Sequence, residues 1–110
     1  RVDPSQGSVV FTGDTQPCQT VTDLAKGADM MLCMCWDEQS VMETANEANG
    51  QCGTTGAARL AQDAGVKKLA LVHMGPSLSK DTPFDRHIEE MTAMYDGQII
   101  FSEELMRIEV

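Results

Sequence analysis

The sequence lacks the features that would place it in a membrane or on nucleic acid. It has no apolar run of about 18 residues, the length that a membrane-spanning helix needs. Its opening residues, Arg1-Val2-Asp3-Pro4, contain no apolar segment typical of a signal peptide. The 8 Lys and Arg are scattered among 17 Asp and Glu, so the net charge is -9 and no basic patch exists to follow a phosphate backbone. We therefore expect no membrane contact and no nucleic-acid partner.

The chain also lacks an initiator methionine, which predicts that it is a segment of a longer protein. Its 110 residues are 42% hydrophobic and contain no internal repeat, a pattern that fits one globular domain. The four cysteines, Cys18, Cys33, Cys35 and Cys52, could form two disulfides, but the chain is not a short, loop-rich scaffold. We therefore expect reduced structural thiols and a cytoplasmic location, with metal binding at Cys33 and Cys35 as the alternative.

Hydrophobic patterning predicts an α/β domain with the order β-α-β-α-β-α-β-β. Short apolar runs predict strands at residues 8–12, 29–36, 68–73, 98–101 and 106–110. Such alternation is typical of a layered structure with at least three parallel strands.

Apolar residues at helical spacing predict the helices between these strands. Three helices are predicted. The first has Pro17 in its first position and closes at Gly27, and the second has Thr54 as its cap and ends at Gly65. The third runs from Phe84 to Tyr95. The polar stretches 37–53 and 77–83 are predicted to be loops, the first with one helical turn. Loops as long as the first are often functional.

Two polar residues follow predicted strands, each beside a glycine that breaks the chain. Asp14 comes after the first strand and His73 ends the third. Ligands of parallel α/β sheets gather beyond the carboxyl ends of the strands, and a carboxylate with an imidazole can share a divalent metal there. The alternative is structural: Asp14 caps the next helix, and His73 is a hydrogen-bonded residue at a strand end.

Four segments, in order, carry a resemblance to a known family. "VVFTGDTQPC" is similar to a strand that ends in Ser/Thr-Gly-Asp-Thr, and "ADMMLCMCWDE" stands where the family has "ADLLIHEAT". "AARLAQDAGVKKLALVHMGP" resembles the family's helix and its strand ending Leu-Thr-His, and "YDGQIIFSEELMRIEV" resembles its closing strands. The sequence thus resembles the C-terminal half of the metallo-β-lactamase superfamily, in the branch of ribonuclease Z-like and arylsulfatase-like hydrolases.

The resemblance implies half of an αββα sandwich, with residues 1–110 as the C-terminal half and the N-terminal half absent. It implies a site with two divalent ions, zinc or alternatively manganese or iron. Asp14 would match the aspartate that bridges the ions and His73 the last histidine ligand, with a water between the ions as the nucleophile. Thr15 would steady the Asp14 carboxylate or its loop, and Gly13 would lie beside the ligand. The implied function is hydrolysis of an ester-like bond.

Departures from the family refine this expectation. Cys33 and Met34 stand where the family has histidine and glutamate, and the stretch 51–54 lacks the histidine common in the branch. These losses argue against transfer-RNA processing and for a small-molecule carboxylic ester, lactone, sulfate or phosphate ester. Met74 and the 77–83 loop would border the substrate pocket, next to Cys33.

The family's His-x-His-x-Asp-His signature is missing, and we interpret the other histidine, His87, as solvated. Two ligands do not hold a catalytic zinc. We therefore expect an inactive chain that needs the N-terminal half, from the same precursor or a second chain, and that could also form a homo-oligomer. The alternatives are a non-catalytic α/β binding or assembly module, a degenerate member without metals, or a redox or metal sensor acting through Cys33 and Cys35.

Overall fold

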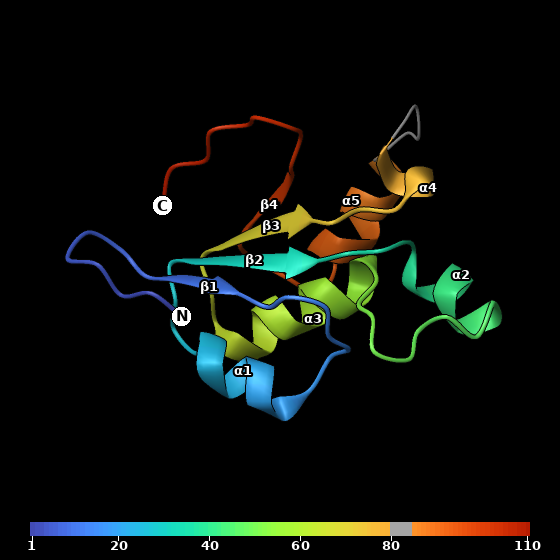
Figure 1. Ribbon diagram of the computed structural model, residues 1–110, viewed down its shortest axis with the longest axis horizontal. Coiled ribbons are helices and arrows are strands. Elements are labelled where there is room, and N and C mark those ends of the chain that lie inside the picture. Colours follow the sequence, from blue (N-terminus) through green and yellow to red (C-terminus); the bar gives the residue numbers. More distant parts are fainter. Residues whose placement is uncertain (80–84) are drawn as a thin grey trace.

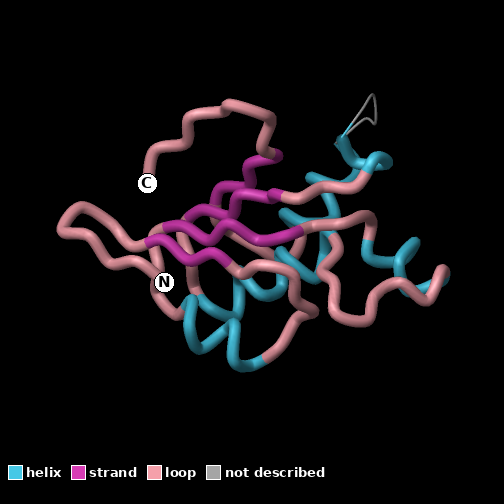
Figure 2. Tube along the Cα trace, in the orientation of Figure 1, coloured by secondary structure: helices cyan, strands magenta, loops and turns pink. Residues whose placement is uncertain are grey.

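The computed structural model describes residues 1–79 and 85–110 and shows one sheet with helices packed along one side (Figures 1 and 2). The elements run in the order β1 (Val9–Phe11), α1 (Gln19–Ala25), β2 (Met30–Met34), α2 (Gln39–Thr44), α3 (Thr54–Ala64), β3 (Lys68–Val72), α4 (Pro76–Ser79), α5 (Asp85–Thr92) and β4 (Gln98–Phe101). The predicted α/β class is confirmed. No helix in the described ranges is long and apolar enough to cross a bilayer.

All four strands are parallel and lie side by side in the order β1-β2-β3-β4. One row across the sheet joins Val10, Met31, Leu69 and Ile99, which lie in the hydrophobic core or pack against it. Three helices supply the buried partners of this face, among them Ala25 of α1, Ala57, Leu60 and Ala61 of α3, and Met91 of α5. Parallel strands place all their carboxyl ends at one edge, which is where the candidate site lies.

The opposite face of the sheet is also apolar but is covered less completely. Its central row joins Phe11, Leu32, Ala70 and Ile100. Phe11 is 59% exposed and Leu32 and Ile100 are half-buried, whereas Ala70 is buried. The segment 102–110 returns on this side of the sheet (Figure 1), where the backbone oxygen of Glu109 accepts a hydrogen bond from Lys68 at 2.7 Å.

The expected strand at 106–110 is wrong, because this segment forms no helix or strand. Strand geometry requires a partner backbone. In the segment 102–110 the bonds to the sheet are the side-chain contact of Lys68 with Glu109 and two bonds from Ser102 to Leu71 at its start. The expected loop at 77–83 is also partly wrong: α4 begins at Pro76, and residues 80–83 lie outside the described ranges.

The predicted helices are present with shifted boundaries. The first begins at Gln19 instead of Pro17, with Cys18 at its N-cap. Thr54 is the first residue of α3 rather than its cap, because Gly53 takes the cap position. The predicted end of α3 at Gly65 is confirmed: its φ of 65° is the left-handed geometry that glycine adopts most readily. Phe84, the predicted start of the last helix, lies outside the described residues.

The interpretation of His87 as a solvated side chain is wrong. His87 is 4% exposed, and its Nδ1 atom has no hydrogen-bond partner among the residues that the structure describes. The Glu38 carboxylate lies 3.9 Å from this nitrogen and also pairs with Arg86. The packing of α5 beside the start of α2 therefore buries a histidine that its own helix would leave at the surface.

Candidate metal centre

Asp14 and His73 lie together at the carboxyl edge of the sheet, as the parallel topology predicts. The Nδ1 atom of His73 is 2.9 Å from Oδ1 of Asp14. Both side chains are accessible, with 56% of His73 and 68% of Asp14 exposed. Residues 59 positions apart in sequence thus bring an imidazole and a carboxylate into contact at one rim.

The turn after β1 directs Asp14 to this rim. Thr12 accepts a hydrogen bond from the Met34 N–H at 3.2 Å and donates one to the Gly13 oxygen at 2.8 Å, which ties the end of β1 to β2. Gly13 has a φ of 61°, and nothing lies within 4 Å of where its Cβ would be. Left-handed geometry therefore sets the turn at Gly13.

The helix-cap alternative for Asp14 does not match the structure. Cys18 occupies the N-cap of α1, four positions beyond Asp14, and this cap has no side-chain hydrogen bond. Thr15 donates its hydroxyl hydrogen bond to the Gln16 oxygen at 2.9 Å and makes no recorded bond to Asp14. This bond lies within the loop after Asp14, and the expected role of Thr15 in steadying the carboxylate or the loop stays a prediction.

Asp14 and His73 line a cavity of about 350 Å³. Its other lining residues are Met34, Trp36, Asn49, Gly50 and Gln51. The sequence did not single out Trp36, Asn49 or Gln51 as site residues. The available signal was the length of the polar stretch 37–53, which predicted a functional loop. The Trp36 ring meets the His73 ring edge-on, with centroids 5.9 Å apart and an interplanar angle of 77°.

Cys33 is buried and does not line this cavity. The interaction between the Cys33 and Cys52 thiols lowers the pKa of Cys33 and raises that of Cys52. Burial raises the pKa of the Cys35 thiol to about 12. All four cysteines are free, and Cys18 alone among them is exposed. Cys33 thus contacts Cys52 from the distant loop, a pairing that the Cys33-x-Cys35 spacing did not indicate.

Met74 lines a different cavity. This space of about 600 Å³ lies beside β4 and is bounded by Met74, Leu78, Ile88, Ile99, Phe101, Ser102, Glu103 and Glu104. Met74 follows His73 directly in sequence, but it does not line the Asp14–His73 cavity. Met74 thus borders a separate cavity, and its expected place at the border of the substrate pocket stays a prediction.

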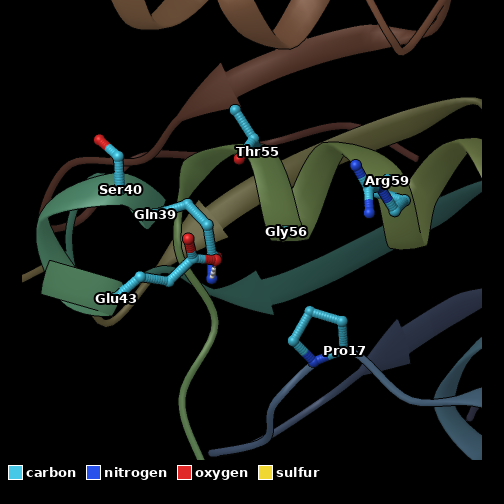
Figure 3. Close-up of a pocket in the computed structure, with 7 residues that line it drawn as sticks. All are labelled: Pro17, Gln39, Ser40, Glu43, Thr55, Gly56 and Arg59. Atoms are coloured by element: carbon cyan, nitrogen blue, oxygen red, sulfur yellow. Dashed lines mark hydrogen bonds between the residues drawn. The ribbon is translucent and has the colours of Figure 1, made fainter. Parts of the chain in front are cut away.

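A further pocket of about 390 Å³ lies between α2, α3 and Pro17 (Figure 3). Gln39 donates a hydrogen bond to Glu43 at 3.0 Å on one wall, and Arg59 projects from α3 on another. None of the residues predicted for the site lines this pocket. Two of the predicted site residues, Asp14 and His73, line the other cavity described above.

Two curated relatives and one crystal structure are similar to this chain. Ribonuclease Z from Thermoplasma volcanium is 34% identical over 102 residues, which are 93% of this chain and 32% of the relative. Ribonuclease Z from Brevibacillus brevis is 37% identical over 100 residues, 90% of this chain and 30% of the relative. The crystal structure of the metallo-β-lactamase fold protein YhfI from Bacillus subtilis matches 86% of this chain and 36% of that chain, with a TM-score of 0.69 and 20% sequence identity.

The chain is similar in sequence to these ribonuclease Z proteins, and it shares the fold of part of a metallo-β-lactamase fold protein. It spans about a third of the length of the curated relatives that it matches. No protein-family model matches the chain. The superfamily resemblance and the α/β fold drawn from the sequence are therefore confirmed, while the metal-binding roles of Asp14 and His73 stay predictions.

Proposed function

We propose that this chain is the C-terminal part of a metal-dependent hydrolase that cleaves an ester-like bond, and that Asp14 and His73 are two of its metal ligands. The observation that supports this most directly is the 2.9 Å contact between the two side chains at the carboxyl edge of the sheet. Its setting in a superfamily fold is the second support.

The donor atoms suit the proposed ions. A carboxylate oxygen and an imidazole nitrogen are ligands of zinc, and they also suit manganese and iron. A catalytic ion needs about three protein ligands. Residues 1–79 and 85–110 contain no group of three histidine, cysteine, aspartate or glutamate side chains that could hold a metal. The remaining ligands would therefore come from outside the described residues.

We propose that a further segment, the N-terminal half of the same fold, supplies these ligands and covers the apolar face around Phe11. The curated relatives are about three times as long as the matched region, which leaves room for such a segment. The protein formed by both parts is called the complete protein below. A second copy of this chain is the other candidate cover.

The residues of this chain would bind and orient. Bound divalent ions would supply an acidified water and polarise the ester. Asp14 would hold them through its exposed carboxylate, and His73 through its ring nitrogen. Asn49 and Gln51, which line the same cavity, offer amide groups that can hydrogen-bond a polar substrate.

Two observations bear on the substrate. The named relatives are ribonucleases, which favours a phosphodiester. The cavity around Asp14 contains neither lysine nor arginine among its described lining residues, and Met34 contributes an apolar wall. This lining favours a small carboxylic ester, lactone, sulfate or phosphate ester over a polyanionic chain.

The test is Asp14→Ala in the complete protein, read out by metal content and turnover. We expect the loss of about one bound ion and a fall in turnover of at least about 100-fold, because the variant would lack a proposed metal ligand. Asp63→Ala, on the exposed side of α3, is the matched control and should change neither quantity. Full metal content and turnover in Asp14→Ala would contradict the proposal.

The alternative function is a non-catalytic module or a superfamily member without metals. The Asp14–His73 contact would then serve only to join the turns after β1 and β3. In that case Asp14→Asn and the unchanged protein should both be free of tightly bound metal after expression in zinc-supplemented medium. Metal analysis of the unchanged complete protein therefore separates the two functions.

A further inference from the structure

His73 has an unusual backbone conformation. Its φ is 53°, a left-handed value that it shares, among the described non-glycine residues, with Asn46 and Leu105. Residues with a Cβ avoid this region unless the surrounding structure enforces it, and such outliers gather at functional sites. The neighbours of His73 should therefore include groups that hold this conformation.

Trp36 is the first of these neighbours. Its ring meets the His73 ring edge-on at 5.9 Å. Its backbone is fixed on both sides, because its N–H donates to the Cys52 oxygen at 2.9 Å and its oxygen accepts from the Gly75 N–H at 2.8 Å. Trp36 thus joins the end of β2 to the loop before α3 and to the chain just after His73.

Gly75 is the second neighbour, and the structure leaves no room for a side chain there. A Cβ at this position would lie 2.5 Å from the Trp36 oxygen and 3.3 Å from two carbons of its indole ring. The chain therefore passes close against Trp36 two residues after His73. This approach fixes the path of the backbone on the carboxyl side of His73, while β3 fixes it on the amino side.

We propose that Trp36 and Gly75 form a clamp that holds His73 in its left-handed conformation with its imidazole turned to Asp14. Trp36 is then a positioning residue that acts on metal binding through His73. The inference rests on the proposed function, because it concerns His73 as a ligand. A ligand already held in its bound orientation loses less rotational freedom on binding, so the clamp raises metal affinity.

The experiment measures zinc affinity of the complete protein by competition with a chromophoric chelator. Trp36→Leu removes the edge-on ring and should weaken zinc binding about tenfold or more, the usual effect of losing a group that orients a ligand. Trp36→Phe keeps an aromatic ring at the same position and should stay within about threefold of the unchanged protein. Gly75→Ala should weaken binding at least as much as Trp36→Leu.

Two further variants fix the scale and control for folding. His73→Ala gives the effect of losing the ligand itself. Gly65→Ala places a side chain at a left-handed position at the far end of α3, where nothing lies within 4 Å of the added Cβ. It should lower folding stability and leave zinc affinity unchanged. Urea unfolding of each metal-free variant accompanies the zinc titration.

The outcomes separate the clamp from the proposed function. If His73→Ala keeps full zinc affinity, the proposed function fails and the clamp fails with it. If His73→Ala loses zinc but Trp36→Leu binds like the unchanged protein, the clamp alone is wrong. The clamp is also wrong if Trp36→Phe weakens binding as much as Trp36→Leu, or if Gly65→Ala weakens it in proportion to lost stability.

Discussion

One aspartate lies at each edge of the sheet, and the two differ in hydrogen bonding and exposure. At the amino edge, Asp29 accepts hydrogen bonds from the Ser8 N–H at 2.9 Å and from the Ser8 hydroxyl at 3.0 Å. Lys67 lies 2.6 Å from its other carboxylate oxygen. The hydrogen bond from Lys67, followed by those from Ser8, lowers the pKa of Asp29 to about 2.

At the carboxyl edge, Asp14 is 68% exposed, and its recorded partner is His73, a residue with strained backbone. Two buried polar atoms toward this edge, Thr54 Oγ1 and His87 Nδ1, have no hydrogen-bond partner within residues 1–79 and 85–110. The comparison teaches that this chain completes the hydrogen bonding of its structural carboxylate by itself. The carboxylate proposed to bind metal keeps its lone pairs accessible.

The largest expected effect is the loss of folding stability in Asp29→Ala. This change removes the acceptor of two hydrogen bonds from Ser8 and the partner of Lys67. Asp14→Ala removes an exposed pair, and exposed pairs contribute about 0.2–1 kcal/mol. In urea unfolding of the metal-free complete protein, the Asp29→Ala midpoint should fall clearly further than the Asp14→Ala midpoint. Equal midpoints would remove the contrast between the edges.

The second effect concerns the pH dependence of stability. Because the folded-state pKa of Asp29 lies near 2, below its ordinary value of 3.8, its contribution is fully present above about pH 4. It is lost as the pH falls toward 2, where the folded form also takes up a proton. Asp29→Asn should therefore be less stable than the unchanged protein at pH 5, and the difference should shrink toward pH 2. If the stabilities of Asp29→Asn and of the unchanged protein differed by the same amount at pH 5 and pH 2, the lowered pKa of Asp29 would be contradicted.

Much of this architecture could be predicted from the sequence because its causes are local. The run Met30–Met34 is apolar at every position, which is typical of a strand buried on both faces of a parallel sheet. The meeting of Asp14 and His73 followed from the same topology, since parallel strands end at one edge. Neither step needed the contacts of individual side chains.

The incorrect predictions depended on contacts between distant parts of the chain. The apolar pattern of 106–110 resembles a strand, but no strand pairs with it. His87 is buried beside Glu38, a residue 49 positions earlier, which no helical pattern within α5 could reveal. Trp36 reaches the site because its backbone bonds to Cys52 and Gly75.

The third prediction compares two serines, one at each edge. Ser8 is 8% exposed; its hydroxyl donates to the Asp29 carboxylate and accepts from the Asp29 N–H, each at 3.0 Å. Ser8→Ala should lower the free energy of unfolding by about 1–3 kcal/mol, since one of its bonds is to a charged group. Ser102→Ala, which loses one bond to the Leu71 oxygen, should cost about 0.5–1.5 kcal/mol. If Ser102→Ala lowered the free energy of unfolding more than Ser8→Ala, the hydrogen bonds at the amino edge would not be the more stabilising ones.

The smallest effect is expected at Thr54, in the first turn of α3. Its Oγ1 is buried without a partner in the described part of the chain, so its hydroxyl has lost water and gained no bond there in return. Thr54→Val replaces the hydroxyl by a methyl of similar shape and should leave the free energy of unfolding unchanged or raise it by up to about 1 kcal/mol. Thr54→Ser keeps the hydroxyl and removes the methyl, so it should be less stable than Thr54→Val. A loss above about 1 kcal/mol in Thr54→Val would mean that Oγ1 is bonded after all, and the carboxyl edge would then be as well satisfied at this position as the amino edge.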